Sequence, residues 1–408
     1  MPKVIAVLAT LDTKGEQAGY LREQLERLGS QALIVDLGVT GTPELPGDVT
    51  REEVARTGGT ALADLVRNPS REAAQPVMAR GALRVLQDRL AAGTLHGVIG
   101  LGGLQGTAVC TEVMRALPYG LPKIMVSTVA SGNTAAYVDV MDITMMFSVA
   151  DIIGLNAFLR KVLANAAGAA HGMAQVEVAL PREQRGKTLI GMSNLGVLTT
   201  GALLALDEFA SRGYEVIVFH AVGSGGRAME LMMRQGIIGA VFDYAMGEIT
   251  DELFGGVRAG GQERLTVAGD LGLPQVLCPG GAEHVGVLVD PPNSVPDRYK
   301  SHKHVFHNPV IFVPRLQSDE MLVVAREIGR RLQHTRSRAV LMLPLAGTGS
   351  YAKPGGPLHD PVSDSAFFAE LRACVPATLP VIERPLHAED PAFVREAVDR
   401  LIALIEEK

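Results

Sequence analysis

Several loops of this 408-residue chain combine glycines with hydroxyl groups directly after an apolar segment, a composition suited to holding an anion. The clearest is HGVIGLGGLQGTAVCTEVM (96–114), where an apolar run leads into Gly102, Gly103, Gly106 and Thr107. The N–H groups that open a helix have no partner within it, and the helix dipole adds partial positive charge there. We therefore predict a phosphate-binding loop. A tight turn without a ligand is the alternative, because the segment is neither a Gly-x-Gly-x-x-Gly fingerprint nor a P-loop with its lysine.

The first apolar segment ends in ATLDTKGE (9–16), which places polar side chains where a strand is expected to give way to a helix. Asp12 is suited to a ribose hydroxyl or to Mg²⁺, and Lys14 to a phosphate, with Thr10 beside them. The alternative is structural, since Asp12 or Thr13 would also cap the helix that follows.

The loop VSTVASGNT (126–134) repeats this pattern after another apolar segment. It offers Ser131, Gly132 and Asn133 as hydrogen-bond donors to a ligand. A helix cap formed by Ser131 or Asn133 is the alternative.

A fourth loop of this kind, HAVGSGGRAME (220–230), lies in the second half of the chain. Its glycines are Gly223, Gly225 and Gly226, and Arg227 follows them directly. An arginine at this position is suited to bidentate binding of a phosphate or carboxylate, or else to a salt bridge with Glu230.

Acid–base groups and ligands of Mg²⁺ are less clearly marked. We take Asp12, Asp142 and His307 as candidate acid–base groups. Asp142 stands in the apolar context VMDITMMF, where a charged group needs a partner or a task. The carboxylates considered for Mg²⁺, together with ligand phosphates, are Asp12, Asp139, Asp142, Asp243, Glu248 and Glu283.

Histidines are concentrated in SHKHVFHNP (301–309), within a long stretch of prolines and histidines (284–309) that has no clear periodicity. In an extended segment, His302 and His304 would share a face, as the ligands of a transition metal do. Spacing fixes no third ligand, so we interpret them as exposed loop histidines and predict no metal centre built by the protein alone.

Composition narrows the classes of function. A net charge of −6 argues against nonspecific binding of nucleic acid, and an aromatic content of 4% leaves few stacking platforms for single strands. The three cysteines lie far apart and predict neither a disulfide framework nor a zinc motif. We see no signal-peptide pattern and no apolar run long enough to span a bilayer, and we expect a cytoplasmic protein.

These loops require a scaffold of alternating strands and helices, and the chain supplies it twice. Segments 4–41 and 188–226 show the same order of strand, loop, helix and strand, at an offset of 213 − 29 = 184 residues. Near-continuous apolar strands are typical of parallel sheets buried on both faces. We predict an α/β fold of two Rossmann-like, doubly wound lobes (1–183 and 184–408), with mainly parallel sheets and a ligand cleft at the carboxyl ends of the strands.

The strands are expected near 4–9, 32–37, 96–101, 123–127 and 143–147 in the first lobe, and near 188–192, 215–220, 239–243, 275–278, 310–313 and 339–343 in the second. Helices are expected between them. The polar run PREQRGK (181–187) is the expected boundary between the lobes.

Several of these motifs together resemble a known family. TLDTKGE, GLGGLQGT, VSTVASGN, DITMMFSVADIIGLN and VFHAVGSGGRAMELM are similar, in order, to bacterial proteins related to the ATP-binding N-terminal domain of a plant tobamovirus-resistance protein. The resemblance implies two Rossmann-like lobes and ATP binding, and a dimer is expected from it. The chain departs from the family pattern at Leu104-Gln105, where Ser-Gly is expected.

Our leading hypothesis is a protein that binds ATP with Mg²⁺, of unknown reaction. The alternative is a transferase or hydrolase that acts on a small phosphorylated or carboxylated metabolite. An interaction scaffold, whose loops only shape a surface, is the third possibility.

Overall fold

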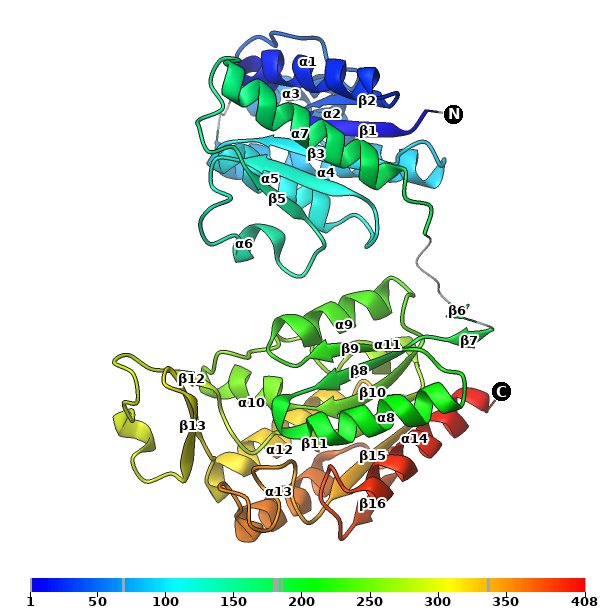
Figure 1. Ribbon diagram of the computed structural model, residues 1–408, viewed down its shortest axis with the longest axis vertical. Coiled ribbons are helices and arrows are strands. Elements are labelled where there is room, and N and C mark those ends of the chain that lie inside the picture. Colours follow the sequence, from blue (N-terminus) through cyan, green and yellow to red (C-terminus); the bar gives the residue numbers. More distant parts are fainter. Residues whose placement is uncertain (1, 68–69, 179–182, 185, 336–337, 408) are drawn as a thin grey trace. The chain divides into compact units, whose positions relative to one another are not determined.

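The computed structural model describes residues 2–67, 70–178, 183–184, 186–335 and 338–407. The chain divides into two compact units, Met1–Ala179 and Leu180–Lys408, which we call the first lobe and the second lobe (Figure 1). Each lobe has its own parallel sheet and its own cores, and we describe each separately.

The first lobe is built on a five-stranded sheet. Its strands are β1 (Val4–Ala9), β2 (Gln31–Asp36), β3 (Gly97–Gly102), β4 (Lys123–Ser127) and β5 (Thr144–Phe147). The spatial order is β2-β1-β3-β4-β5, and every neighbouring pair is parallel. The chain passes from one side of β1 to the other between β2 and β3, which creates a topological switch point between β1 and β3. Sheets of this kind bind ligands beyond the carboxyl ends of the strands at that point.

Helices cover both faces of this sheet (Figure 1). They are α1 (Leu11–Arg27), α2 (Arg51–Thr57), α3 (Leu62–Arg67), α4 (Arg71–Ala91), α5 (Leu104–Arg115), α6 (Ala135–Val138) and α7 (Ala157–Ala174). In β1, Ile5 and Val7 pack with α1 and α7, whereas Ala6 and Leu8 pack with α2, α4 and α5. Alternate residues of a strand point to opposite faces, so a sheet covered on both sides requires the continuous apolar strands that the sequence contains.

The second lobe contains a six-stranded sheet. Its strands are β8 (Ile190–Asn194), β9 (Val216–His220), β10 (Ala240–Ala245), β11 (Gln275–Gly280), β15 (Ala339–Pro344) and β16 (Val381–Arg384). The order β16-β15-β11-β10-β8-β9 is parallel throughout. Read from β9, it repeats the order of the first lobe and adds β16 at the far edge. The predicted α/β fold with two mainly parallel sheets is confirmed, and the repeat in the sequence corresponds to a repeated topology.

The helices of the second lobe also cover both faces of their sheet. They are α8 (Thr199–Ser211), α9 (Ser224–Arg234), α10 (Gly247–Phe254), α11 (Val267–Leu271), α12 (Ser318–Leu332), α13 (Pro361–Cys374) and α14 (Pro391–Glu406), with short 3₁₀ turns at Gly196–Leu198 and Asp297–Tyr299. One face packs on α8 and α14, with Phe209 and Phe393 in its core. The other face packs on α9 to α13, with Met229 and Ile328 among its core residues.

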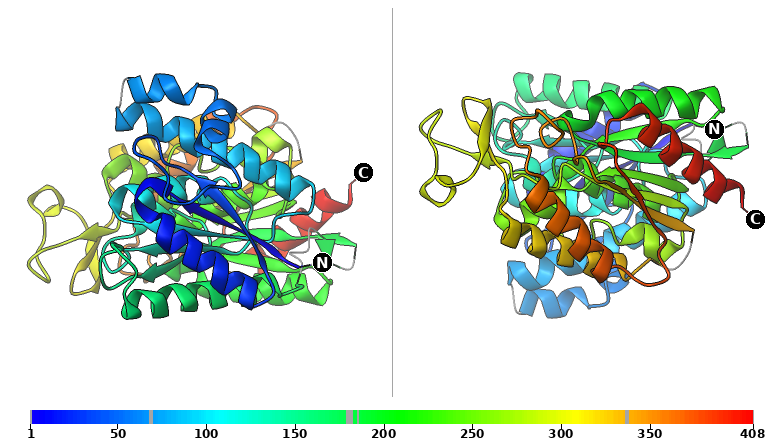
Figure 2. Two further views of the ribbon diagram at one scale, coloured as in Figure 1. Left: turned by 90° about the horizontal axis from the view of Figure 1, so that it is seen from above. Right: turned by 90° about the horizontal axis from the view of Figure 1, so that it is seen from below.

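A small antiparallel sheet extends the second lobe and projects from its body (Figure 2). Its strands are β12 (Val287–Leu288), β13 (His304–Asn308) and β14 (Ile311–Pro314), in the order β12-β14-β13. The stretch 284–309, which has no clear periodicity in the sequence, contains β12 and β13. The strand expected at 310–313 corresponds to β14 and therefore belongs to this small sheet rather than to the large one. A two-stranded hairpin of β6 (Glu183–Gln184) and β7 (Lys187–Thr188) precedes β8.

Across the described ranges, none of the helices combines the length and the apolar character needed to cross a bilayer.

Candidate functional site

A pocket of about 430 Å³ lies at the carboxyl edge of the first sheet, beside its switch point. Its walls come from Thr10 and the first turn of α1, the loop after β2, and the N-terminal parts of α4 and α5. The lining residues are Thr10, Asp12, Thr13, Leu37, Gly38, Val39, Thr40, Ser70, Ala74, Gln75, Met78, Gln105, Gly106 and Val109. We call it the switch-point pocket.

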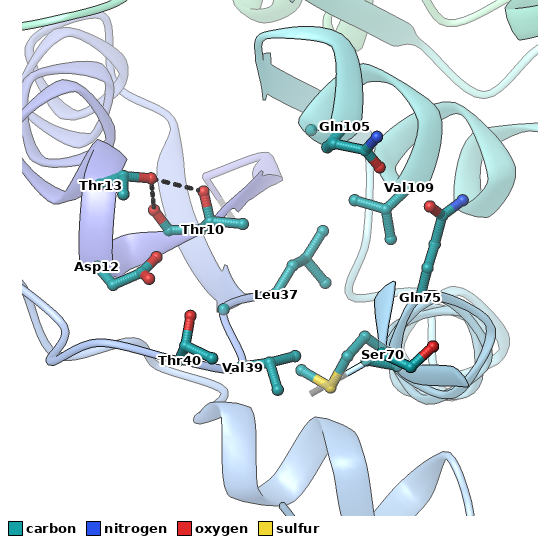
Figure 3. Close-up of a pocket in the computed structure, with 14 residues that line it drawn as sticks. Thr10, Asp12, Thr13, Leu37, Val39, Thr40, Ser70, Gln75, Gln105 and Val109 are labelled. Atoms are coloured by element: carbon teal, nitrogen blue, oxygen red, sulfur yellow. Dashed lines mark hydrogen bonds between the residues drawn. The ribbon is translucent and has the colours of Figure 1, made fainter. Parts of the chain in front are cut away.

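The pocket combines an apolar middle with polar ends. Figure 3 shows Leu37 between two groups of side chains, with Thr10, Asp12 and Thr13 on one side and Gln75, Gln105 and Val109 on the other. An apolar cavity with a few placed polar groups is the usual form of a small-molecule site.

The start of α5 borders this pocket through Gln105 and Gly106. No side chain caps α5, and in the described part of the chain the N–H groups of Leu104, Gln105 and Gly106 donate to no protein group. The first N–H to be used is that of Thr107, which donates to Gly103 O at 2.8 Å. Three unused donors at the positive end of a twelve-residue helix form a position suited to an anion.

The glycines before α5 differ in what they do. A Cβ on Gly102 would lie 2.7 Å from Gly106 Cα, so Gly102 allows α5 to pack closely on β3. A Cβ on Gly103 would meet only Thr128 Oγ1, at 3.7 Å. Thr107 is buried, and its hydroxyl is 2.6 Å from Ser127 Oγ. In the predicted phosphate loop, Gly102 and Thr107 therefore serve packing, while Gly103 and Gly106 lie at the open helix start.

Two aspartates at the pocket edge have different roles. Asp36, at the end of β2, accepts the N–H groups of Leu11 and Gly38 at 3.1 and 2.8 Å. Burial raises the pKa of Asp36, and the neighbouring charge of Asp12 adds to this effect. The carboxylate of Asp12 lines the pocket, and within the described residues it accepts no hydrogen bond. Asp12 is thus the acidic group that remains available to a ligand.

The other predicted contacts of the first lobe lie outside the pocket lining. Lys14 stands at a kink in α1 (φ −133°, ψ 16°), and its ammonium donates to Thr13 O at 3.3 Å. Ser131, Gly132 and Asn133 are exposed in the loop before α6. Asn133 accepts the N–H of Ala135 at 3.0 Å in a local turn, but the N-cap of α6 is Thr134 and no side chain caps this helix, so the cap considered for Ser131 or Asn133 is not formed.

Asp142 lies at the opposite, amino edge of the first sheet, directly before β5. Its carboxylate is 2.6 Å from the ammonium of Lys123, and it accepts the N–H of Gly120 at 2.8 Å. Lys123 is fully buried at the start of β4, and burial lowers its pKa while Asp142 raises it. The task of Asp142 is to pair with a buried cation, so we no longer consider it an acid–base group of the pocket.

The glycine loop before α9 is filled by the protein's own carboxylate. Glu248 accepts the N–H groups of Gly223 and Gly226 at 2.6 and 3.0 Å. Gly223 has a φ of 90°, which glycine adopts readily. A Cβ on Gly226 would collide with Glu248 and Arg264, and one on Gly225 with His220 O. The anion at this helix start is therefore Glu248, and we leave Gly223, Gly225, Gly226 and the exposed Arg227 out of the proposed site.

Glu248 belongs to a buried cluster of three carboxylates around one guanidinium. Arg264 donates to Glu248 at 2.7 Å, to Asp243 at 2.5 and 2.6 Å, and to Glu230 at 3.4 Å. Burial raises the pKa of Glu230 to about 7, although Arg264 lowers it. Burial is the main reason why Glu230 holds its proton near neutral pH, and the nearby charge of Asp243 adds a smaller effect in the same direction.

Glu230→Gln is expected to flatten the pH dependence of the second lobe's stability. The folded state holds this proton up to about pH 7, whereas the ordinary value is 4.5. The contribution of Glu230 to stability is thus complete below pH 4.5 and is lost as the pH rises through about 7. In the wild type, the urea midpoint of the second lobe should be lower at about pH 8 than at about pH 5. In the variant, the difference between these two midpoints should be smaller. Equal pH slopes in both proteins would contradict the assignment.

The candidate histidines do not converge on a metal. His302 Nε2 is 3.0 Å from Glu320, while His304 is exposed and its Nδ1 lies 3.0 Å from His302 O. Among the residues that the structure describes, no group of three or more His, Cys, Asp or Glu is placed to hold a metal ion. His307 lines a cavity of the second lobe, discussed below.

The fold and the site together define a two-lobed parallel α/β protein, with an open pocket and an uncapped helix start at the switch point of its first sheet. Residues 3–179 match the N-terminal domain, and residues 187–405 the C-terminal domain, of the family described as "Uncharacterised protein family (UPF0261)". The chain belongs to this family.

Relatives cover the chain from end to end. A UPF0261 protein of Clostridium tetani is 36% identical over 407 residues, covering 100% of both chains. One from Rhizobium meliloti is 37% identical over 398 residues, covering 97% of this chain and 98% of the relative. The chain is also similar to the tomato ToMV resistance protein Tm-1(GCR237), with 33% identity over 315 residues, which are 76% of this chain and 42% of the tomato protein.

Sequence reasoning missed two walls of the switch-point pocket. Leu37–Thr40 directly follow an apolar strand, and we did not predict them as site residues. Their segment, DLGVTG, nevertheless shows the same pattern as the other loops, an apolar strand followed by glycines. Gln75 and Met78 of α4 also line the pocket, but no local motif marks them, because they reach it only through the packing of α4 on the sheet.

Proposed function

We propose that the first lobe binds ATP, with the nucleoside in the switch-point pocket and the phosphates at the start of α5. The observation that carries this proposal is the uncapped α5, whose N–H groups at Leu104, Gln105 and Gly106 have no partner among the described residues. These donors border an apolar pocket of about 430 Å³. The motif resemblance, which implies ATP binding, favours the same ligand.

Mg²⁺ fits this arrangement as a companion of the nucleotide. The ion usually takes one or two carboxylates and completes its shell with water and phosphate oxygens. Asp12 is the pocket carboxylate that accepts no hydrogen bond from a described residue. When bound, Mg²⁺ would neutralise phosphate charge that Asp12 would otherwise repel.

Binding of adenosine, AMP, ADP and ATP to the full chain, measured by calorimetry, tests the proposal. ATP with Mg²⁺ is expected to bind at least about tenfold more tightly than adenosine, which corresponds to about 1.4 kcal/mol from the phosphates. Chelation of Mg²⁺ should weaken the binding of ATP, and Asp12→Asn should reduce this dependence on the ion.

Asp88→Asn is the matched control, since it makes the same change at an exposed position of α4 outside the pocket lining. It should leave the affinity for ATP within about twofold. Equal affinities for adenosine and ATP would refute a phosphate site at α5. If phosphate or AMP bound tightly and ATP did not bind, the result would favour the alternative, an enzyme that acts on a small phosphorylated metabolite.

A further inference from the structure

A second pocket, of about 400 Å³, lies at the carboxyl edge of the sheet in the second lobe. Its walls are largely apolar, with Leu195, Val222 and Ile311 among them. Arg258 and His284 give it a polar part. We call it the Arg258 pocket, and the proposed ATP site makes no use of it.

We propose that the Arg258 pocket binds a small organic acid, a single carboxylate on an apolar body. The argument rests on the way the protein holds Arg258 and on what this arrangement leaves unsatisfied.

Arg258 is held rigidly by buried acceptors. Its side chain is 9% exposed, and Asp251, its carboxylate partner, is fully buried. Arg258 Nε donates to Asp251 Oδ2 at 3.0 Å and Nη2 to Oδ1 at 2.7 Å, a bidentate pair. Nη2 also donates to His284 O at 2.8 Å. A guanidinium fixed in this way loses little conformational freedom when a ligand arrives.

His284 fixes the remaining nitrogen of Arg258. Arg258 Nη1 lies 3.1 Å from His284 Nε2, and a guanidinium can only donate, so Nε2 accepts and the ring hydrogen lies on Nδ1. Nδ1 in turn donates to Glu283 Oε1 at 2.8 Å, and Thr348 Oγ1 donates to Glu283 Oε2 at 2.6 Å. Burial raises the pKa of Glu283, whereas the hydrogen bonds from His284 and Thr348 and the charge of Arg315 lower it, and the pKa stays below its usual value. The chain of hydrogen bonds from Thr348 to Arg258 is therefore anchored on an ionised carboxylate.

One hydrogen of Arg258 has no acceptor within the described residues. A guanidinium has five N–H donors, and the side-chain bonds of Arg258 use one on Nε, two on Nη2 and one on Nη1. The fifth, on Nη1, belongs to a side chain that is nine-tenths buried and lines the pocket. A buried donor without an acceptor costs free energy, which a ligand oxygen would recover.

The other lining groups indicate the size and charge of the ligand. Arg258 is the one Lys or Arg side chain in the described lining, and Asp251 already pairs with its charge, so its remaining N–H suits a single carboxylate oxygen rather than a triphosphate. The apolar walls suit a short aliphatic or aromatic body. His307 of β13 and Tyr351, whose ring lies 5.9 Å from that of His284, add polar atoms for a hydroxyl or oxo group.

Calorimetry on the full chain with benzoate and isovalerate, against benzamide and isovaleramide, tests this proposal. The amides keep the shape and remove the charge. At least one acid is expected to bind, and at least about tenfold more tightly than its amide. Failure of both acids to bind, or equal binding of acid and amide, would overturn the proposal.

Two variants locate the binding. Gly196→Leu adds a side chain at the pocket wall, where a Cβ meets no atom within 4 Å, so the lobe should fold and the acid should bind at least about tenfold more weakly. Gly168→Leu is the matched control, since its Cβ also meets no atom within 4 Å but lies on α7 of the first lobe. Arg258→Lys keeps the charge but loses the fixed N–H, and should weaken binding as well. Gly168→Leu should bind the acid like the wild type. If Gly196→Leu and Arg258→Lys also bind it like the wild type, the acid binds elsewhere and the proposal is wrong.

Discussion

Replacing Arg264 by methionine is expected to lower the unfolding free energy of the second lobe by about 3–5 kcal/mol, a large share of the stability of a domain. Arg264 is fully buried and is the counter-ion of Asp243, Glu248 and Glu230. Methionine retains much of the volume but leaves Asp243 and Glu248 without their cation, and Glu230 loses a hydrogen-bond donor. Removing one partner of a buried ion pair costs more than the pair contributes, because the remaining charge stays desolvated.

The measurement is a urea series read by hydrogen exchange and mass spectrometry, in which peptides of β8 and β10 report the second lobe separately. Arg395→Met is the control, since Arg395 makes a more exposed pair with Glu208 at 2.9 Å. Pairs of that kind contribute no more than about 1 kcal/mol. A loss for Arg264→Met as small as that of the control would show that the buried cluster does not depend on its arginine.

Gly103→Val is expected to weaken ATP binding at least about tenfold, or by about 1.4 kcal/mol, without unfolding the first lobe. A Cβ at Gly103 has room, since its nearest neighbour would be Thr128 Oγ1 at 3.7 Å. The branched side chain would stand at the open start of α5 and obstruct the approach of a phosphate to the N–H groups there. Calorimetry with ATP and Mg²⁺ measures the effect.

Gly102→Val, one residue earlier, should behave differently. Its Cβ would be 2.7 Å from Gly106 Cα, so the variant must displace α5 from β3 and lose thermal stability. The pair of variants thus separates a glycine that serves the ligand from one that serves the packing. If Gly103→Val bound ATP as tightly as the wild type, the phosphates would not bind at the start of α5.

The sheet architecture could be predicted from the sequence because local patterns determine it. Strands buried on both faces must be apolar along their whole length, and β1 and β4 lie at the bounds expected for them. The edge strand β16 was not predicted, because it has only four residues (VIER) and two of them are charged. Of the antiparallel β12-β14-β13 sheet, only the strand near 310–313 was predicted, where β14 lies, and it was assigned to the large sheet. β12 and β13 were missed, because these strands are short and lie in a stretch without clear periodicity.

The candidate site was predicted only in part, because glycine loops look alike in sequence whether their amides meet a ligand or a side chain. The loops before α5 and α9 have similar compositions. In the structure the first is uncapped, and the second is filled by Glu248, 22 residues after Gly226. The partner of a helix start is decided by tertiary packing, which no local motif encodes. The same holds for Asp142, whose partner Lys123 lies on a neighbouring strand.

A crystal structure of the full chain with a non-hydrolysable ATP analogue and Mg²⁺ tests the central claim most directly. We predict the base in contact with Leu37 and Met78, and phosphate oxygens within hydrogen-bond distance of the N–H groups of Leu104, Gln105 or Gly106. A nucleotide bound elsewhere, with the start of α5 in contact with water alone, would contradict it.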